Sequence, residues 1–275
     1  MGYLYQVASQ DAAITFGWPA SARERARLER DLLAVIDPAL AAAAELAGVE
    51  SPPSAGPLLA AFLAVHGRRP LAENKGGSGL NDSLWLFLVA RLLDPVLLVE
   101  SGTWRGQSAW LFRQACPAAE IVTFDVAVPA EGRCETPGVR YCLHDWSAVP
   151  LAPSATGRSL VFFDDHVSHA RRLAEAAARG FELALFDDNF AARHLHATGA
   201  PPVPTLAMLL DEATPPGGQI EWQRNGKIYR YDDTAERRQA ARRLVAAHLT
   251  LPELAPVTRH PPGSGMTLVR LRADA

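Results

Sequence analysis

Acidic residues stand at the ends of five short apolar segments of this sequence. They are Glu100, Asp125, Asp145, the pair Asp164 and Asp165, and the pair Asp187 and Asp188. If these segments are neighbouring strands of a parallel sheet, the carboxylates gather beyond the carboxyl ends of the strands, where ligands bind. One acidic residue at one strand end is common, but five in succession predict a built site.

The turn after the first apolar segment, residues 100–108 (ESGTWRGQS), has the composition of a ligand-binding turn. Gly102 and Gly106 let the backbone turn tightly and approach a ligand, and a helix beginning near Ser108 would direct amide groups toward it. A dinucleotide fingerprint needs three glycines spaced GxGxxG, whereas this turn contains GxxxG. The pattern therefore disfavours a pyrophosphate on the backbone, and a tight strand–helix turn without a ligand is the alternative.

Asp125 and Asp145 follow the second and third apolar segments. A carboxylate at the end of the second strand can accept hydrogen bonds from both ribose hydroxyls, which suits NAD and other nucleoside cofactors alike. Asp145, which stands between His144 and Trp146, can receive an adenine amino group. Capping of a helix or turn explains Asp145 equally well.

The elements that must position these residues alternate between apolar strands and helices. The predicted strands are residues 95–100, 121–126, 139–146, 159–166, 181–189 and 266–273. With helical segments at 108–116 and 168–180, they indicate βαβ units and a parallel sheet with right-handed crossovers. The Asn225-Gly226 pair predicts a hairpin within residues 219–232, and a helix is expected over 235–249.

The first ninety residues predict helices. Ser21 is expected to cap a helix, and Pro38 to open a second, alanine-rich one that ends near residue 47. Shorter helices are expected over 58–65 and 83–93. At this length, 275 residues fit one large α/β domain with an appendage or two small domains.

Residues 73–82, ENKGGSGLND, form an unusual loop immediately before a predicted helix. Three glycines and Lys75 predict either a turn that accepts an anion or a flexible connector, since the spacing fits no P-loop. We expect this loop to border the active site and to become more ordered when a ligand binds.

Composition excludes several classes of function. The net charge of −3 leaves no dominant basic face for nucleic acid or acidic membranes. The N-terminus shows no targeting segment, and the most apolar stretch, residues 84–99, is interrupted and too short for a membrane span. Three cysteines without CxxC spacing fit buried thiols in a reducing cytosol, so a cytoplasmic protein is expected.

The segment VLLVESGTWRGQSAW, followed by FDV, FFDDH and FDDN, resembles the class I S-adenosylmethionine-dependent methyltransferases. Within them it is most similar to the metal-dependent small-molecule O-methyltransferases, of the catechol and macrolide-sugar types. The resemblance covers about residues 95–190. It implies a Rossmann-like α/β sheet, mostly parallel, whose antiparallel C-terminal edge contains the hairpin and the last strand. Residues 1–94 would be a helical extension that covers the active site or builds a dimer contact, and residues 95–275 the domain that binds S-adenosylmethionine.

The resemblance also implies roles for individual residues. The first turn would surround the methionine moiety, Asp125 would hold the ribose, and Asp145 would lie near the adenine. The candidate cofactor-binding residues are Glu100, Gly102, Thr103, Gly106, Ser108, Asp125 and Asp145.

A divalent metal would be bound by Asp164, Asp188 and Asn189, again by resemblance. Hard oxygen ligands suit Mg²⁺, which accepts substrate oxygens in the rest of its coordination sphere and makes a bound hydroxyl more acidic. Asp165 and Asp187 are then expected to support the ligands or to cap helices. The alternative is that all of these aspartates are helix caps.

One departure concerns the catalytic base. Where catechol-type enzymes carry a lysine, this chain has Val167-Ser168-His169, with His166 beside the acidic pair. A histidine base is sensible near neutral pH, and we expect His166 to fill that role together with Asp164. The other candidates are His169, His194 and His196. The departure favours a sugar or natural-product hydroxyl over a catechol.

The sequence therefore predicts an O-methyltransferase that uses S-adenosylmethionine and Mg²⁺ or another divalent cation on a small molecule, sugar or glycan. A homo-oligomer is compatible with this prediction. One rival is an NAD-type oxidoreductase, which the missing third glycine disfavours. A non-catalytic protein that binds S-adenosylmethionine is the other, and the clustered acids at the fourth and fifth strand ends argue against it.

Overall fold

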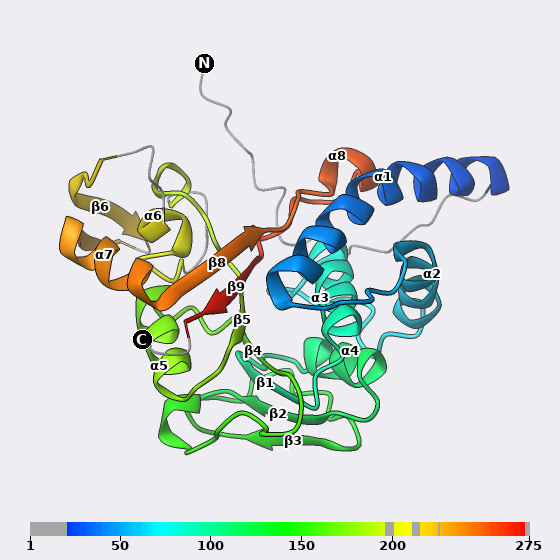
Figure 1. Ribbon diagram of the computed structural model, residues 1–275, viewed down its shortest axis with the longest axis horizontal. Helices are drawn as coiled ribbons and strands as arrows, with labels where there is room; N and C mark the ends of the chain where they lie inside the picture. Colours follow the sequence, from blue (N-terminus) through cyan, green and yellow to red (C-terminus); the bar gives the residue numbers. More distant parts are fainter. Residues whose placement is uncertain (1–20, 196–200, 211–214, 225, 273–275) are drawn as a thin grey trace.

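The computed structural model describes residues 21–195, 201–210, 215–224 and 226–272 (Figure 1). Its centre is a seven-stranded sheet in the order β3-β2-β1-β4-β5-β9-β8. The strands are β1 (Leu97–Ser101), β2 (Glu120–Phe124), β3 (Val139–Cys142), β4 (Ser159–Phe163), β5 (Leu183–Phe186), β8 (Val245–Thr250) and β9 (Thr267–Leu271). Strands β1 to β5 pair in parallel, and β9 is antiparallel to both of its neighbours, β5 and β8. The predicted fold class, a mostly parallel Rossmann-like sheet, is confirmed.

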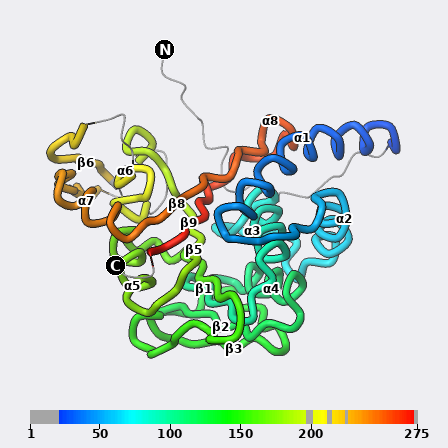
Figure 2. Tube along the Cα trace, in the orientation of Figure 1, coloured from blue at the N-terminus to red at the C-terminus, as the bar shows by residue number. Residues whose placement is uncertain are grey.

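Helices cover both faces of this sheet. They are α1 (Ala22–Ala47), α2 (Ala55–His66), α3 (Leu80–Leu93), α4 (Gln107–Ala115), α5 (His169–Ala178), α6 (Leu206–Leu210), α7 (Ala235–Leu244) and α8 (Ala255–Thr258). Short 3₁₀ turns follow β3 (Trp146–Ala148) and β5 (Ala192–His194). The helices α1 to α4 share one hydrophobic core with one face of the sheet, and α5 to α7 share a second core with the other (Figures 1 and 2). The predicted boundary at residue 94 thus falls between α3 and β1, within a continuous core.

The N-terminal helix begins as expected and ends later than expected. Ser21 caps α1 by accepting a hydrogen bond from the backbone N–H of Glu24 at 3.2 Å. The prediction that Pro38 opens a second helix was wrong, because α1 runs through this residue without a break. A proline inside a helix costs about 3 kcal/mol. Burial of Ile36 and Leu40 on either side of it offsets this cost.

Two predictions about the C-terminal third are corrected by the structure. The helix expected over 235–249 ends at Leu244, and the chain continues directly into β8. Pairing of β8 with β9 overrides the helical preference of these alanine-rich residues. The predicted hairpin forms from β6 (Gly218–Arg224) and β7 (Lys227–Asp233), but as a separate two-stranded sheet, so that β8 makes the edge of the main sheet. Of the turn pair, Gly226 has a left-handed φ of +73° and Asn225 lies outside the described residues.

Among the described helices, none is both long enough and apolar enough to cross a membrane. The three cysteines are free thiols. Only Cys116 is buried, so the expectation of buried thiols holds for one of the three.

Candidate active site

A cavity of about 370 Å³ opens at the carboxyl ends of the parallel strands. Its wall comes from the ends of β1 and β2 and the turns after β1, β2, β3 and β4, with Gly76 from the loop before α3 and Arg172 from α5. Of the predicted site residues, the wall contains Gly102, Asp125, Asp145, Asp164 and His166. Strand ends that are far apart in sequence therefore meet around one cavity, as the acidic pattern predicts.

Glu100 lies in β1 and is fully buried. It directly precedes Ser101 and Gly102, which form part of the cavity wall. Burial raises the pKa of its carboxyl to about 7, and the hydroxyls of Ser108 and Thr123 offset this only in part. Thr123 donates a hydrogen bond to Oε2, while Oε1 has no hydrogen-bond partner among the described residues. Thr103, whose hydroxyl meets that of Thr123, is buried and supports this pair rather than the cavity. A buried acceptor without a donor is costly unless a ligand supplies one.

The two glycines of the first turn serve contacts within the chain. Gly102 has φ +110°, and a Cβ there would lie 2.3 Å from the carbonyl oxygen of Asp164. Gly106 has φ +82°, and its Cβ would lie 2.3 Å from the carbonyl oxygen of Cys134. Gly102 thus lets the turn after β1 pack against the turn after β4, which brings the two halves of the cavity together.

Asp125 fixes the first turn and the loop above it. Its Oδ2 accepts a hydrogen bond from the backbone N–H of Trp104 at 2.8 Å, and its Oδ1 accepts one from Ala127. The indole Nε1 of Trp104 donates to the backbone carbonyl of Lys75 at 3.0 Å. The segment 73–82, whose last three residues form the first turn of α3, therefore borders the cavity through Gly76, as expected.

Asp145 is held by an arginine that the sequence analysis did not single out. The guanidinium of Arg172 donates to both carboxylate oxygens of Asp145, at 3.1 and 2.7 Å, and also pairs with Asp165 and Glu175. Hydrogen bonding to Arg172 holds the pKa of Asp145 far below its ordinary value. Arg172 is 1% exposed and lies on the face of α5 that carries buried Leu173 and Ala176. A charged residue at the apolar positions of an amphipathic helix was the signal that could have revealed it.

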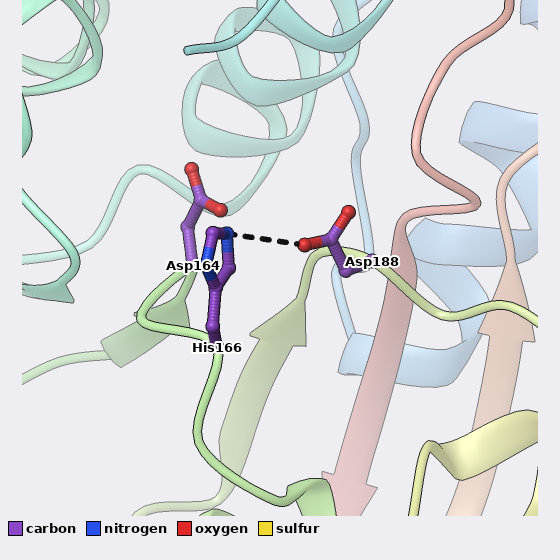
Figure 3. A group of neighbouring side chains, drawn as sticks. All are labelled: Asp164, His166 and Asp188. Carbon is purple, nitrogen blue, oxygen red and sulfur yellow. Dashed lines mark ion pairs between the residues drawn. The ribbon is translucent and has the colours of Figure 1, made fainter. Parts of the chain in front are cut away.

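Asp164, His166 and Asp188 form the group of described residues that could hold a metal ion, with one ligand atom of each lying within 4.8 Å of the others. Figure 3 shows their side chains meeting from the loops after β4 and β5. His166 Nε2 lies 3.3 Å from Asp188 Oδ2. Both residues adopt left-handed backbone conformations, with φ of +57° and +52°. Such conformations are uncommon outside glycine, and they aim these side chains at each other.

Two further carboxylates, those of Asp187 and Asp82, adjoin this group. Asp187 is buried and accepts a hydrogen bond from the Ser264 hydroxyl. The Ser264 backbone N–H donates to Asp82, at the start of α3, and the Ser264 hydroxyl oxygen lies 3.0 Å from the same carboxylate oxygen. Burial raises the pKa values of Asp82, Asp164, Asp187 and Asp188. Repulsion from other members of the group adds to the effect at the last three, and repulsion from Glu253 adds to it at Asp82. Asp82 ends the segment 73–82 that the sequence analysis expected at the site, whereas no motif in the sequence marked Ser264.

Asn189, which the resemblance placed on the metal, uses its amide elsewhere. Its Nδ2 donates to Thr267 at 2.6 Å, and its Oδ1 accepts from the backbone N–H of Ala207 at 2.6 Å. Asn189 is 8% exposed and joins β9 to the segment that begins α6. The residue that adjoins Asp164 and Asp188 from this side is Asp187.

The histidines occupy different environments. His169 is buried, burial lowers its pKa to about 3, and its Nδ1 accepts from the backbone N–H of Leu206, so it serves the fold. His194 is exposed in the 3₁₀ turn after β5. His196 lies outside the described residues. His166 is the histidine on the cavity wall beside the acidic pair.

The carboxyls of Asp82, Asp164, Asp187 and Asp188, called the acidic group from here on, predict how the free energy of unfolding depends on pH when no metal is bound. Because the folded state raises these carboxyl pKa values, it holds more protons than the unfolded state, whose carboxyls titrate near 4. In a chelating buffer, the free energy of unfolding should therefore fall as pH rises above about 4, by up to about 1.4 kcal/mol per pH unit for each proton held. Mg²⁺ should restore stability most strongly at the high end of this range. Denaturant unfolding between pH 5 and 8 measures both effects.

The matched comparison uses two equivalent substitutions. Asp164→Asn removes one member of the group and should flatten this dependence, whereas Asp232→Asn, on the exposed hairpin, should leave it unchanged. An equal slope in the two variants would contradict the assignment.

No protein-family model matches the chain, and no curated protein sequence matches it. Among solved structures, the chain is similar to the SAH-bound methyltransferase PaMTH1 of Podospora anserina, with a TM-score of 0.41, 17% identity, and coverage of 86% of this chain and 95% of that one. It is similar to the O-methyltransferase TomG of Streptomyces achromogenes, involved in tomaymycin synthesis and in complex with SAM, with a TM-score of 0.40, 15% identity and coverage of 81% and 92%. A third is CmcI with Mg and SAM, with a TM-score of 0.43, 13% identity and coverage of 71% and 73%. The order of the strands in the main sheet, with β9 as its single antiparallel strand, is that of the class I methyltransferase fold.

Proposed function

We propose that this protein transfers the methyl group of S-adenosylmethionine to a hydroxyl oxygen of a small molecule or sugar, with the help of a divalent cation. The observation that carries the proposal is a single cavity whose wall combines two kinds of residue. Gly102 and Asp125, from the turns after β1 and β2, form what we call the cofactor side, and Asp164 and His166, from the turn after β4, form the cation side, where His166 pairs with Asp188. A methyl donor and an activated acceptor need to meet in such a place.

The residues fit the cofactor. Glu100 offers a buried carboxylate oxygen without a donor, which suits the cationic amino group of a methionine moiety. Asp125 keeps lone pairs for ribose hydroxyls beyond those used by Trp104 and Ala127. When bound, S-adenosylmethionine supplies a methyl group that is activated by its sulfonium. Asp145 borders the cavity, where its Arg172 partner keeps it ionised and fixed.

The residues also fit a hard divalent cation. We assign Asp164 and Asp188 as its carboxylate ligands. Asp187, whose carboxyl lies beside both, is proposed as a further carboxylate of the site instead of Asn189, since the Asn189 amide is used by Thr267 and Ala207. Oxygen donors of this kind suit Mg²⁺ or Mn²⁺. When bound, the cation supplies Lewis acidity toward an acceptor oxygen. Its charge also offsets the burial and the mutual repulsion that raise the pKa values of these carboxyls.

His166 is proposed as the base. Its imidazole accepts the acceptor's proton on a ring nitrogen, and Asp188, at 3.3 Å from Nε2, orients the ring and stabilises the imidazolium that results. The side chain is partly exposed at the cavity, so the proton can leave to solvent. Trp104 and Gly76 line the cavity, and the hydrogen bond from the Trp104 indole to the Lys75 carbonyl joins the two segments there.

Calorimetric titration tests the proposal directly. The purified protein is titrated with S-adenosylhomocysteine and with NAD⁺, each with and without Mg²⁺, and radiolabelled S-adenosylmethionine is then offered with a panel of sugar and phenolic hydroxyls. We expect S-adenosylhomocysteine to bind without metal and label transfer to need metal. Preferential binding of NAD⁺ would favour an oxidoreductase, and cofactor binding without metal binding and without any label transfer would favour a non-catalytic protein.

Glu100→Gln gives a prediction specific to the cofactor. The carboxyl, with a pKa of about 7, must ionise to pair with an amino group, so affinity for S-adenosylhomocysteine should rise between pH 6 and 8. The variant should bind about 10- to 100-fold more weakly, because a hydrogen bond to a charged group is worth about 1.5–3 kcal/mol, and the rise with pH should disappear. The control is Glu120→Gln. Glu120 is exposed and is the first residue of β2, at the edge of the sheet opposite to the cavity. Wild-type affinity in Glu100→Gln would place the amino group elsewhere.

A further inference from the structure

The amino ends of the strands, opposite to the candidate active site, carry a second and larger hollow. It has a volume of about 980 Å³ and lies where β4 and β5 begin, where β9 ends and where α7 passes into β8. Ala47 and Gly48, at the end of α1, also line it. The helix α1 lies next to β8 and β9 (Figure 1). Because β4 and β5 span four or five residues at about 3.3 Å each, the sheet itself separates this hollow from the candidate active site.

The charge of this hollow is its distinctive property. Its lining includes five arginines and a single acidic residue: Arg158, Arg242, Arg243, Arg270, Arg272 and Glu182. The whole chain has a net charge of −3, so this concentration of positive charge does not follow from overall composition. A concave surface of one sign focuses the electric field and attracts ions of opposite sign.

Part of the cluster has a structural use. Arg158 donates to the backbone carbonyl of Gly48 at 3.0 Å, and Arg270 donates to that of Leu46 at 3.5 Å, so both satisfy carbonyls at the end of α1. The C-terminal ends of α1 and α7 each contribute about half a negative charge. These partial charges and Glu182 together leave a clear excess of positive charge in the hollow.

Two arginines of the cluster have donors to spare. Arg243, in the last turn of α7, and Arg272, directly after β9, are both exposed. Neither side chain makes a hydrogen bond or ion pair with the described part of the chain. The two arginines come from neighbouring elements. The backbone N–H of Arg272 donates to the carbonyl of Leu244, the last residue of α7, at 2.9 Å, and this hydrogen bond fixes the end of α7 beside the end of β9. Guanidinium groups held in this way present planar pairs of N–H donors, which match the oxygens of a phosphate group.

We propose that this hollow binds a small ligand carrying a di- or triphosphate group, at a site separate from the methyl-transfer cavity. Arg243 and Arg272 contact the phosphate oxygens, and the tethered Arg158 and Arg270 add charge to the wall. The buried Leu183 and Leu271 form part of the lining between the charged residues. This proposal is independent of the activity proposed above.

Inorganic triphosphate, in metal-free buffer of low ionic strength, is the probe. We expect saturable binding with one site per chain that weakens as salt is added. The double variant Arg243→Gln/Arg272→Gln should bind roughly tenfold more weakly or worse, since each lost guanidinium removes charge-assisted hydrogen bonds. The control Arg23→Gln/Arg25→Gln makes the same change of net charge on the exposed start of α1 and should bind as the wild type does.

Binding of S-adenosylhomocysteine and a thermal melt show in the same preparations whether the variants are folded. Equal triphosphate affinity in the two double variants would overturn the proposal, and so would the absence of triphosphate binding at low salt. Tighter binding of a single-stranded oligonucleotide or of anionic lipid vesicles, lost in the same variant, would assign the hollow to a macromolecule and overturn the small-ligand assignment.

Discussion

Asp188→Asn is expected to abolish methyl transfer while leaving binding of S-adenosylhomocysteine nearly intact. The asparagine keeps the shape of the side chain but removes a negative charge from the cation site and from His166. Loss of even an indirect partner of a metal ligand costs about 10- to 100-fold, so turnover should fall by about a hundredfold or more. The cofactor side of the cavity, with Gly102 and Asp125, does not involve Asp188.

The measurements separate the steps. Calorimetry with Mn²⁺ should show that cation binding is lost in Asp188→Asn, and calorimetry with S-adenosylhomocysteine should show that the cofactor site remains. Asp232→Asn, the same substitution on the exposed hairpin, should leave both unchanged. Full activity of chelated wild-type protein, with no metal found by elemental analysis, would leave a transferase that works with histidine alone.

Arg172→Leu should be among the most destabilising single substitutions in this chain. It removes a guanidinium that is 1% exposed and leaves Asp145, Asp165 and Glu175 without their shared partner. Removal of one partner from a buried ion pair costs about 3–5 kcal/mol. Chemical denaturation at pH 7 should show a loss of this size, and the cavity wall, which contains Arg172, Asp145 and Asp165, should bind S-adenosylhomocysteine more weakly.

The neighbouring residue provides the control. Arg171 also pairs with Glu175 and Asp145, but its side chain is 53% exposed, so Arg171→Leu should cost about 1 kcal/mol or less. The pH dependence gives a second check. Since Arg172 lowers the pKa of Asp145, the stability it contributes is fully present above about pH 4 and is lost as pH falls through the lower folded pKa. The difference between wild type and Arg172→Leu should therefore shrink below pH 4, and a constant difference would contradict this account.

The sequence predicted the parallel part of the fold well, because each of its strands is a short apolar run that ends in an acidic residue. The same pattern predicted that Asp125, Asp145 and Asp164 meet at one cavity, since the carboxyl ends of parallel strands share one edge of the sheet. It could not predict that β8 forms from residues that favour a helix. That outcome depends on pairing with β9, which local propensity does not contain.

The candidate site, too, was predicted only in part. The spacing identified the aspartates at the ends of β4 and β5, but it did not decide which of them face the proposed cation site. The amide of Asn189 is taken by Thr267 and by the backbone of Ala207, partners that only the folded chain brings close. Arg172 likewise acts through three carboxylates from separate segments, so no local motif encodes its role.

The position of β9 decides when the site can be completed during synthesis. This strand is the last of the sheet in sequence, yet it lies between β5 and β8 in space, and Ser264 in the segment before it contacts both Asp187 and Asp82. A nascent chain that has not yet passed residue 264 holds β5 as an open edge, with the acidic group lacking its serine partner. The ribosome has to release almost all of the described chain before the cation side can form. The helices α1 to α4 and the strands that build the cofactor side have by then left the ribosome.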